Sequence, residues 1–559
     1  MPIASSPTAA EPAASSHARV ILAASLGTAF EWYDFILFGS LAGVISRQFF
    51  SAVNETTGFI FALLTFAAGF AVRPLGALIF GRLGDLVGRK KTFLITIVLM
   101  GTATALVGVL PTYEVAGIAA PVALIALRMM QGLAIGGEYG GACIYVAEHA
   151  PAHQRGRYTS WIQATSTFAL LMSLLVILVC RAALGAEFES WGWRIPFLVS
   201  TVLLGISVYV RMRLAESPVF ARMMAEGSCS RAPVQESFGD WRNLKRILAV
   251  LFGATAGMNV VWYGAQLYPL YFLTQVLKVE PQRASILLAW ALAIGTPFYL
   301  IFGRLSDRIG RKRVFMTGIL LATLTFFPLY RGLTHFANPA IDSASRRAPV
   351  AVLAAPGTCS LQFDPVGERK FLRSCDVAKA ALARAGIPYT NESSAPAAVA
   401  MIRVGRAGEA AVEVPAFEGA ALSPERLRQE RQAFASHLDR VLAAAGYPKA
   451  ADPARMNQPA VVLLLTVLVL YVTVVTAPMS AWLVELFPAR IRYTSLSVPY
   501  HIGAGWFGGF LPAVAFMIVA VTGDIYSGLW YAITVLTVTL IIGSLFLPET
   551  AGRHGKASL

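Results

Sequence analysis

Charged side chains inside apolar segments are the residues of this sequence that could do chemistry. The first long apolar segment carries Glu31 and Asp34, which share one face of a helix because they are three residues apart. A second segment carries Arg73, and a later one carries Arg128 and Glu138. Ionisable groups are costly in lipid and usually face a cavity and a partner, so these residues are candidates for binding an ion or a polar solute.

Carboxylates and arginines suit different parts of such chemistry. A buried arginine keeps its proton, whereas burial and neighbouring charges tune a carboxylate. Counting about 1.5 Å per residue along each helix places Arg128 near the depth of Asp34. The same count places Arg73 near the depth of Glu138. We predict that Asp34 or Glu31 loads and releases a proton, while an anionic substrate could compete for the arginines. Ion pairs that only fix helix register are the alternative.

The second half of the chain offers weaker candidates. Tyr263 and Gln266 lie on one face of an apolar segment and could line a cavity. His501 could titrate near physiological pH, or it could be a hydrogen-bonded packing residue. The sequence has no Walker loop, catalytic set or metal-ligand cluster of convincing spacing. We therefore predict neither an enzyme nor a cofactor or metal site, and the energy must come from an ion gradient or the substrate's own gradient.

The elements that position these residues are duplicated. Residues 81–91 recur as 303–313 with seven of eleven positions identical, at an offset of 222 (303 − 81). A second pair, at 157–160 and 492–495, is offset by 335 (492 − 157). About 113 extra residues (335 − 222) must therefore lie between the two pairs in the second half. Parallel halves that rock about a central site are a common design of secondary transporters.

The bulk composition is that of a helical membrane protein. The 559 residues are 56% hydrophobic and 14% charged, and the mean hydropathy is +0.62. Apolar segments of roughly 20 residues can cross a bilayer as helices. The net charge of +15 lies mainly in short loops, which is typical of cytoplasmic loops and not of nucleic-acid binding. We predict twelve spans, at 19–46, 57–82, 92–112, 117–147, 158–182, 193–213, 246–277, 284–305, 314–334, 458–486, 493–521 and 525–547.

The spans divide the chain into two six-helix bundles and an insert. The insert is polar, and because it follows the ninth span we expect it on the side opposite the basic loops and both termini. We predict strands at 348–354 and 397–404 and a helix at 423–445 within it. Cys359 and Cys375 in the insert are a possible disulfide, and two free thiols are the alternative. We predict these parts: a disordered cytoplasmic tail at 1–18, the first bundle at 19–213, a cytoplasmic connector at 214–245, helices seven to nine at 246–334, a small α/β insert at 335–457, helices ten to twelve at 458–547 and a cytoplasmic tail at 548–559.

The duplicated loops are candidates for conformational gating. Each holds an aspartate followed four residues later by an arginine, and each half also has a glutamate just before a basic stretch. Such charges can meet helix termini and basic loops, and can hold the halves closed on one side. Simple anchoring of the topology is the alternative. The predicted gating residues are Asp85, Arg89, Glu148, Asp307, Arg311 and Glu485.

The motifs resemble those of the major facilitator superfamily. The loop at 81–90 matches its signature, and Arg128 with the glycines after it resembles a motif that is associated there with proton-coupled transport. Residues 215–218 and 548–552 resemble motifs of its sugar-porter-like branch. Glu31-Trp-Tyr-Asp34 and the stretch 131–141 look more narrowly like the metabolite:proton symporter family, whose members include carriers for 2-oxoglutarate, citrate, shikimate and proline/betaine.

This resemblance implies a function. We expect a monomeric, proton-coupled importer of a small polar metabolite, with a carboxylate preferred, in the lipid bilayer of a bacterial inner membrane. Its partners would be the substrate and the proton, with no nucleic acid. An exporter of drugs or metabolites on the same fold is one alternative. A membrane-embedded sensor whose insert binds the ligand is another.

Overall fold

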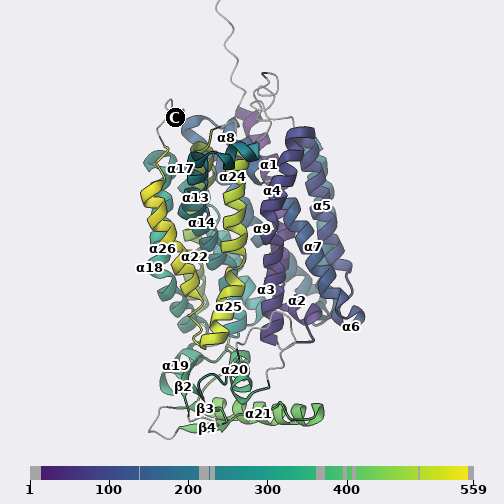
Figure 1. The fold of residues 1–559 in the computed structure, drawn as a ribbon, viewed down its shortest axis with the longest axis vertical. Coiled ribbons are helices and arrows are strands. Elements are labelled where there is room, and N and C mark those ends of the chain that lie inside the picture. The colour runs from purple at the N-terminus through teal and green to yellow at the C-terminus, as the bar shows by residue number, and fades with distance from the viewer. Residues whose placement is uncertain are drawn as a thin grey trace, which may run out of the picture.

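Long helices stand side by side in the computed structural model, and a small domain lies at one end of them (Figure 1). The structure describes residues 14–53, 55–87, 89–137, 139–212, 226, 233–360, 372–394, 399–405, 411–488 and 491–551. The end of the molecule that carries the small domain is called the insert end below. The opposite end, which carries the duplicated loops, is called the loop end.

Helices fill the first half of the chain. Contacts of α1 with α9 and α10, and of α5 with α7 and α10, gather them into one bundle. These helices are α1 (Ala14–Ser40), α2 (Ala42–Phe49), α3 (Glu55–Ala71), α4 (Arg73–Val87), α5 (Arg89–Val109), α6 (Tyr113–Ala116), α7 (Ala119–Gly136), α8 (Tyr139–His149), η1 (Ala152–Gln154), α9 (Arg155–Leu184), η2 (Phe188–Gly192) and α10 (Arg194–Met212).

The second bundle contains segments of π-helix. Three of them interrupt the seventh span and one interrupts the eleventh. Segments of π-helix are rare in proteins, and those that occur often lie at functional sites. The helices of this half are α12 (Pro233–Gly239), α13 (Trp241–Val250), η3 (Leu251–Thr255), α14 (Ala256–Trp262), η4 (Tyr263–Leu267), α15 (Tyr268–Tyr271), η5 (Phe272–Val276), α16 (Pro281–Gly295), α17 (Phe298–Ile309), α18 (Arg311–Ala337), α22 (Gln458–Thr476), α23 (Met479–Leu486), α24 (Arg492–Ile502), η6 (Gly503–Gly509), α25 (Leu511–Thr522) and α26 (Leu529–Phe546).

The predicted fold class is confirmed. Among the described residues, nine helices are long and apolar enough to cross a bilayer, and two shorter apolar helices, Leu94–Val109 and Arg194–Tyr209, continue the series. Together with α1 they occupy the places of the twelve predicted spans. The bundles meet along a seam, to which α3, α4, α8 and α9 contribute from the first half and η4, α16, α17, α23, α24, η6 and α25 from the second.

The insert is a small α/β domain with a core of its own. Its strands lie in the order β2-β1-β3-β4, with β2 parallel to β1 and the other pairs antiparallel. The predicted strands and helix correspond to β1, β3 and α21, whereas β2, β4 and α20 were not predicted. The elements of the insert are α19 (Pro339–Arg347), β1 (Val350–Ala354), α20 (Ser374–Ala385), β2 (Tyr389–Ser393), β3 (Met401–Val404), β4 (Val412–Pro415) and α21 (Pro424–Ala444).

A disulfide joins Cys359, just after β1, to Cys375 in the first turn of α20. The two Cα atoms are 5.2 Å apart, within the range that disulfides require. The bond ties the first strand of the insert to its first long helix. It therefore reinforces a domain whose sheet has only four short strands.

Candidate functional site

Two buried arginines lie together in the first bundle. Arg73 opens α4 and Arg128 lies within α7, and neither side chain is exposed. Their guanidinium carbons lie 4.4 Å and 4.1 Å from the centre of the same Phe35 ring, on α1. Two positive charges therefore share one aromatic side chain in the interior of the protein.

Further aromatic rings enclose the two guanidinium groups. Arg73 lies 4.0 Å from the centre of the Phe70 ring and 5.1 Å from that of Trp32, and Arg128 lies 4.5 Å from that of Phe38. Desolvated cation–π contacts, each worth about 2 kcal/mol, offset part of the cost of burying the two charges, but the rings carry no net charge. The rings hold the arginines in place without neutralising them. We call these rings the aromatic cage: Trp32, Phe35, Phe38, Phe66 and Phe70.

Most guanidinium nitrogens have no hydrogen-bond partner. All three nitrogens of Arg73, and Nε and Nη2 of Arg128, lack a partner among the described residues. Nη1 of Arg128 donates to Gln131 Oε1 at 2.6 Å and makes a longer bond, 3.4 Å, to the Phe35 carbonyl oxygen. Buried polar groups are otherwise almost always paired, so five unpaired donor atoms indicate a site for an anion.

The glycines that follow Arg128 bring the two arginines together. A Cβ atom added at Gly132 would collide with the carbonyl oxygen of Gly69 on α3, and one added at Gly136 would collide with the Arg73 carbonyl oxygen. Only glycine allows the backbone of α7 to approach α3 and α4 so closely. The small-residue pattern therefore has a packing role that also positions the charges.

The two acids of α1 occupy a different part of the first bundle. Glu31 and Asp34 are each 5% exposed and lie close enough to interact electrostatically. The hydroxyls of Ser200 on α10 and Thr104 on α5 lie beside the Asp34 carboxylate, although Oδ1 itself has no hydrogen bond among the described residues. Asp34 therefore faces α5 and α10, away from the arginines.

A chain of polar side chains connects the acid to the arginines. Gln131 accepts a hydrogen bond from Arg128 and donates one through Nε2 to Thr104 Oγ1, at 2.8 Å. Thr104 is also the hydroxyl beside Asp34. Equal depth suggested a direct pair of Arg128 with Asp34, but in the structure Gln131 and the Phe35 carbonyl take that place. Glu138, the possible partner of Arg73, lies outside the described residues.

The candidates of the second bundle lie along the seam. Gln266 donates through Nε2 to Thr167 on α9 at 2.8 Å, so it links the two halves. Tyr263 packs its ring on Phe70 with centroids 5.4 Å apart, and its hydroxyl has no partner among the described residues. That hydroxyl lies within electrostatic range of both arginines, and buried His501 lies beside Arg73.

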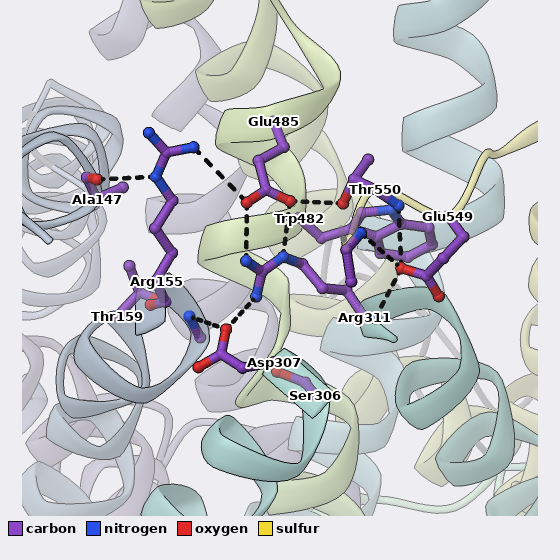
Figure 2. A network of polar contacts seen from close by, with 12 residues as sticks. Ala147, Arg155, Thr159, Ser306, Asp307, Arg311, Trp482, Glu485, Glu549 and Thr550 are labelled. Carbon is purple, nitrogen blue, oxygen red and sulfur yellow. Dashed lines mark hydrogen bonds and ion pairs between the residues drawn. The ribbon is translucent and has the colours of Figure 1, made fainter. Parts of the chain in front are cut away.

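A network of charges closes the loop end (Figure 2). Arg311 binds Glu485 with two hydrogen bonds, of 2.7 Å and 2.8 Å, and donates a third to Asp307 at 2.9 Å. Asp307 also accepts hydrogen bonds from the backbone N–H groups of Gly156 and Arg157 at the start of α9, at 2.8 Å and 2.9 Å. Because α9 belongs to the first bundle, this network joins the two halves.

Two further ion pairs cross the seam at this end. Arg492 lies 3.3 Å from Glu148, and Arg155 lies 3.8 Å from Glu485. The structure thus places four of the six predicted gating residues, Glu148, Asp307, Arg311 and Glu485, in contact with partners of opposite charge. The side chains of the other two, Asp85 and Arg89, lie outside the part that the structure describes.

The C-terminal segment contributes residues that were not predicted for this network. Glu549 accepts a hydrogen bond from the backbone N–H of Arg311 at 2.8 Å, at the start of α18, where a negative charge is favourable. Thr550 donates to Glu485 at 2.6 Å. The only signal was the similarity of residues 548–552 to a known C-terminal motif, which carries no information about the partner.

Replacing Glu485 by glutamine is expected to destabilise the closed loop end. The side chain of Arg311 is 2% exposed, and it would lose the charged carboxylate that it binds with two hydrogen bonds. Breaking such a buried ion pair costs about 3–5 kcal/mol. Thermal unfolding of the purified variant should show a clear drop in Tm. Glu425→Gln, at an exposed position on α21, is the control. Equal Tm values for the two variants would contradict a structural role for the pair.

The insert end is closed by contacts between the halves as well. The Tyr271 hydroxyl donates to the Gly39 carbonyl oxygen at 2.7 Å, and the rings of Phe59 on α3 and Phe516 on α25 lie 5.2 Å apart. The site between the two ends is therefore occluded from both sides.

An ion-pair cluster shapes the first bundle at the insert end. Glu189 in η2 binds Arg47 and Arg181, the latter at 2.7 Å. Burial alone would raise the pKa of Glu189, but the two arginines outweigh it and hold the pKa below its usual value. Glu189 is therefore ionised at neutral pH and pins η2 to α2 and α9.

Comparisons with known proteins agree with this architecture. A family described as sugar and other transporters matches residues 20–240, and one described as MFS/sugar transport proteins matches residues 142–342. The shikimate transporter of Escherichia coli (strain K12) is 36% identical over 322 residues, which are 56% of this chain and 72% of that protein. The proline/betaine transporter of the same organism is 35% identical over 326 residues, and the match covers 64% of its length.

Solved structures share the fold. The proton:xylose symporter XylE bound to 6-bromo-6-deoxy-D-glucose has a TM-score of 0.59 and 15% identity, over 96% of this chain and 97% of that one. Its partially occluded inward-open form from E. coli also has a TM-score of 0.59, at 15% identity, over 97% of this chain and all of that one. At this identity the likeness concerns the fold alone. The family matches and the 36% identity over 72% of the shikimate transporter show that the chain belongs to the major facilitator superfamily of membrane transporters, where it is a relative of the shikimate transporter within the metabolite:proton symporter family.

Proposed function

We propose that the protein imports a small carboxylate together with a proton, by alternating access. The observation that supports this proposal is the pair of buried arginines. Five of their nitrogens have no partner among the described residues, which points to an anionic ligand. A carboxylate matches the planar fork of a guanidinium group with two parallel hydrogen bonds. The hydroxyl of Tyr263, which has no partner among the residues that the structure describes, adds a donor from the second bundle.

The aromatic cage argues for a carboxylate over a quaternary ammonium ligand. Aromatic cages recognise such cations through the faces of their rings. Here Arg73 and Arg128 already lie over these faces, at 4.0 Å to 5.2 Å from the ring centres. A betaine-like ammonium group would meet two positive charges in place of open rings. A zwitterion such as proline is therefore the less favoured substrate, although the proline/betaine transporter is a relative.

Proton coupling would use the polar chain inside the first bundle. Protonation of Asp34 would remove a negative charge beside Thr104, whose hydroxyl donates to the Met100 carbonyl oxygen at 2.9 Å and accepts from Gln131. A changed hydrogen bond at Thr104 would alter the orientation of Gln131 and hence the Nη1 donor of Arg128. Glu31 is the alternative proton site. In this scheme the proton and the substrate bind at different places and interact through Gln131.

The orientation follows from charge. The basic loops belong to the loop end, so by the positive-inside rule we propose that this end and both termini face the cytoplasm of a bacterial cell. The insert then faces the outside of the inner membrane, where its disulfide would be stable. Because both bundles belong to one chain, a monomer contains both sides of the seam between them.

Uptake into proteoliposomes under an imposed pH gradient tests this proposal. We expect shikimate, 2-oxoglutarate or citrate to accumulate when the outside is acidic, and proline and glycine betaine not to accumulate. Accumulation of glycine betaine alone would overturn the carboxylate assignment. Flux of the carboxylate against the expected direction would favour an exporter. Carboxylate binding without any flux would favour a sensor.

A further inference from the structure

A groove lies within the insert, between the edge of the sheet and α21. Its volume is about 540 Å³, which is within the range of roughly 300–1,000 Å³ that is usual for small-molecule sites. Three of the elements that line it, β3, β4 and α21, lie on the side of the insert that is away from the bundles (Figure 1). A solute can therefore reach the groove while both ends of the bundles are closed.

Much of the lining of the groove is apolar. Val404 on β3 and Val412 on β4 are paired partners in the sheet, and Val441 lines the groove from α21. Val412 is 46% exposed although its side chain is apolar. Apolar side chains that remain exposed in a concave site favour a ligand with an apolar body.

Three basic side chains line the same groove, and they come from two different elements. Arg347 is the last residue of α19, whereas His437 and Arg440 are three residues apart and so share one face of α21. No lining residue is acidic among those that the structure describes. The groove therefore combines an apolar wall with positive charge, a combination that suits an organic anion.

The two arginines are not neutralised by carboxylates of the described residues. Arg440 makes one long hydrogen bond, of 3.4 Å, from Nε to the Ser436 carbonyl oxygen, and its terminal nitrogens make none within the described ranges. Arg347 has neither a hydrogen bond from its side chain nor an ion pair in that part of the chain. The acid next to Arg440, Asp439, is bound to Lys449 at 2.8 Å.

The end of α21 holds Arg347 at the groove. A Cβ atom at Gly446, which follows the C-cap of α21, would lie 3.8 Å from Nη2 of Arg347. A cation is favourable at the C-terminus of a helix, where the partial charge is about half of an elementary charge. Arg347 is therefore positioned without a full opposite charge, and it keeps a net attraction for an anion.

Hydrogen bonds between the walls fix the shape of the groove. The hydroxyl of Tyr447, just beyond α21, donates to the Ala348 carbonyl oxygen at 2.8 Å. The N–H of Gly405, just after β3, donates to the Pro349 carbonyl oxygen at 3.0 Å. Both acceptors belong to the short link between α19 and β1, so this link joins α21 to the sheet. A site that is formed before its ligand arrives spends little of the binding free energy on ordering.

We propose that this groove binds an organic acid, whose carboxylate pairs with Arg347 and Arg440 while its apolar body packs on the three valines. Guanidinium groups bind carboxylates with parallel hydrogen bonds, and the ring of His437 can donate a further one. An inorganic anion would leave the apolar wall exposed to water. The site lies apart from the buried arginines of the first bundle and does not depend on the proposed function.

Labelling of a cysteine in the groove tests the site on the purified full-length protein. Ala444 is exposed and lines the groove, and peptide mass spectrometry can follow maleimide modification of Ala444→Cys apart from the native cysteines. Benzoate should slow this modification several-fold. The added change Arg347→Gln/Arg440→Gln should raise the benzoate concentration for half-protection by about tenfold or more, because charged hydrogen bonds are lost. Gln429→Cys, exposed on α21 outside the groove, should show no protection.

Two further probes test the class of ligand. Benzamide has nearly the shape of benzoate without its charge, and inorganic phosphate has the charge without the apolar ring, so both should protect much less than benzoate. Equal protection by benzamide would show that the cationic residues play no part. Equal protection by phosphate would show that the valines play none, and either result would overturn the assignment to organic acids. Modification that benzoate leaves unchanged would contradict the site itself.

Two matched variants separate the groove from other charges of the protein. Arg428→Gln/Arg431→Gln removes the same charge from exposed positions of α21 outside the groove, and Arg128→Lys changes the buried site of the first bundle. Both should keep the protection by benzoate, and its loss in either variant would overturn the proposal. If the double substitution in the groove lowers Tm, Arg440→Gln alone serves, and it should weaken the protection by a smaller factor.

Discussion

Replacing Arg128 by lysine is expected to reduce carboxylate uptake, measured as kcat/KM, by roughly 100-fold or more. Lysine keeps the positive charge but lacks the planar fork that binds a carboxylate with two hydrogen bonds. Truncating one partner of a buried charged hydrogen bond costs about 2–5 kcal/mol. The change also removes the donor to Gln131 and so disturbs the contact with Thr104. The measurement is initial uptake of shikimate into proteoliposomes at several concentrations.

Arg331→Lys is the matched control, because Arg331 is exposed and lies over Tyr526 in an open position, 5.8 Å from its ring centre. It should leave uptake within about twofold of the wild type, the usual result for a surface substitution. A normal KM in Arg128→Lys would mean that Arg128 holds the helices together and does not contact the substrate. Thermal unfolding of both variants excludes misfolding as the cause of a loss.

The arginine site shows what a sequence can and cannot predict about a helical bundle. A charged residue within an apolar segment is visible directly, so the amino-acid sequence alone singles out Glu31, Asp34, Arg73 and Arg128. Counting residues gives the depth of a side chain along the helix axis, and it gives the direction only relative to other residues of the same helix. The contact between helices depends on rotation about their axes, which the sequence of one helix does not determine.

Asp34 and Phe35 illustrate this difference. They are adjacent on α1, so their side chains point about 100° apart. In the structure the face with Phe35 meets both arginines, while Asp34 faces Ser200 and Thr104. The aromatic rings of the cage looked like ordinary core residues in the sequence, because nothing local marks a phenylalanine that will lie against a guanidinium group.

The insert was predictable where its pattern was local. Strand β3 alternates intermediate and buried residues, and α21 buries Phe434 and Leu438 on one face. Strand β2 reads Tyr-Thr-Asn-Glu-Ser, with only Tyr389 buried, so it carries no apolar alternation. Its place depends on parallel pairing with β1, a contact between distant parts of the chain. Glu549 likewise gains its role only when the tail folds back on α18.

Replacing Asp34 by asparagine is expected to abolish accumulation driven by a pH gradient and to spare exchange of substrate across the membrane. An amide has nearly the same shape as a carboxyl group but cannot exchange a proton, so the carrier would no longer be driven by the gradient. The pathway through Arg128 would remain, and labelled shikimate should still exchange with unlabelled shikimate inside. Accumulation ratios should fall at least tenfold, towards equilibration. Asp452→Asn, in an exposed turn of the insert, is the control.

Glu31→Gln distinguishes the two acids, because Glu31 lies close to Asp34 and is equally buried. If Asp34 carries the proton, Glu31→Gln should retain gradient-driven accumulation while Asp34→Asn loses it. The opposite result would assign the proton to Glu31, and the polar chain through Thr104 and Gln131 would then lose its proposed role. Full accumulation by both variants would exclude this acid pair from coupling. The double substitution should behave like the more severe single one if both acids share one proton, since groups that act as a unit are not additive.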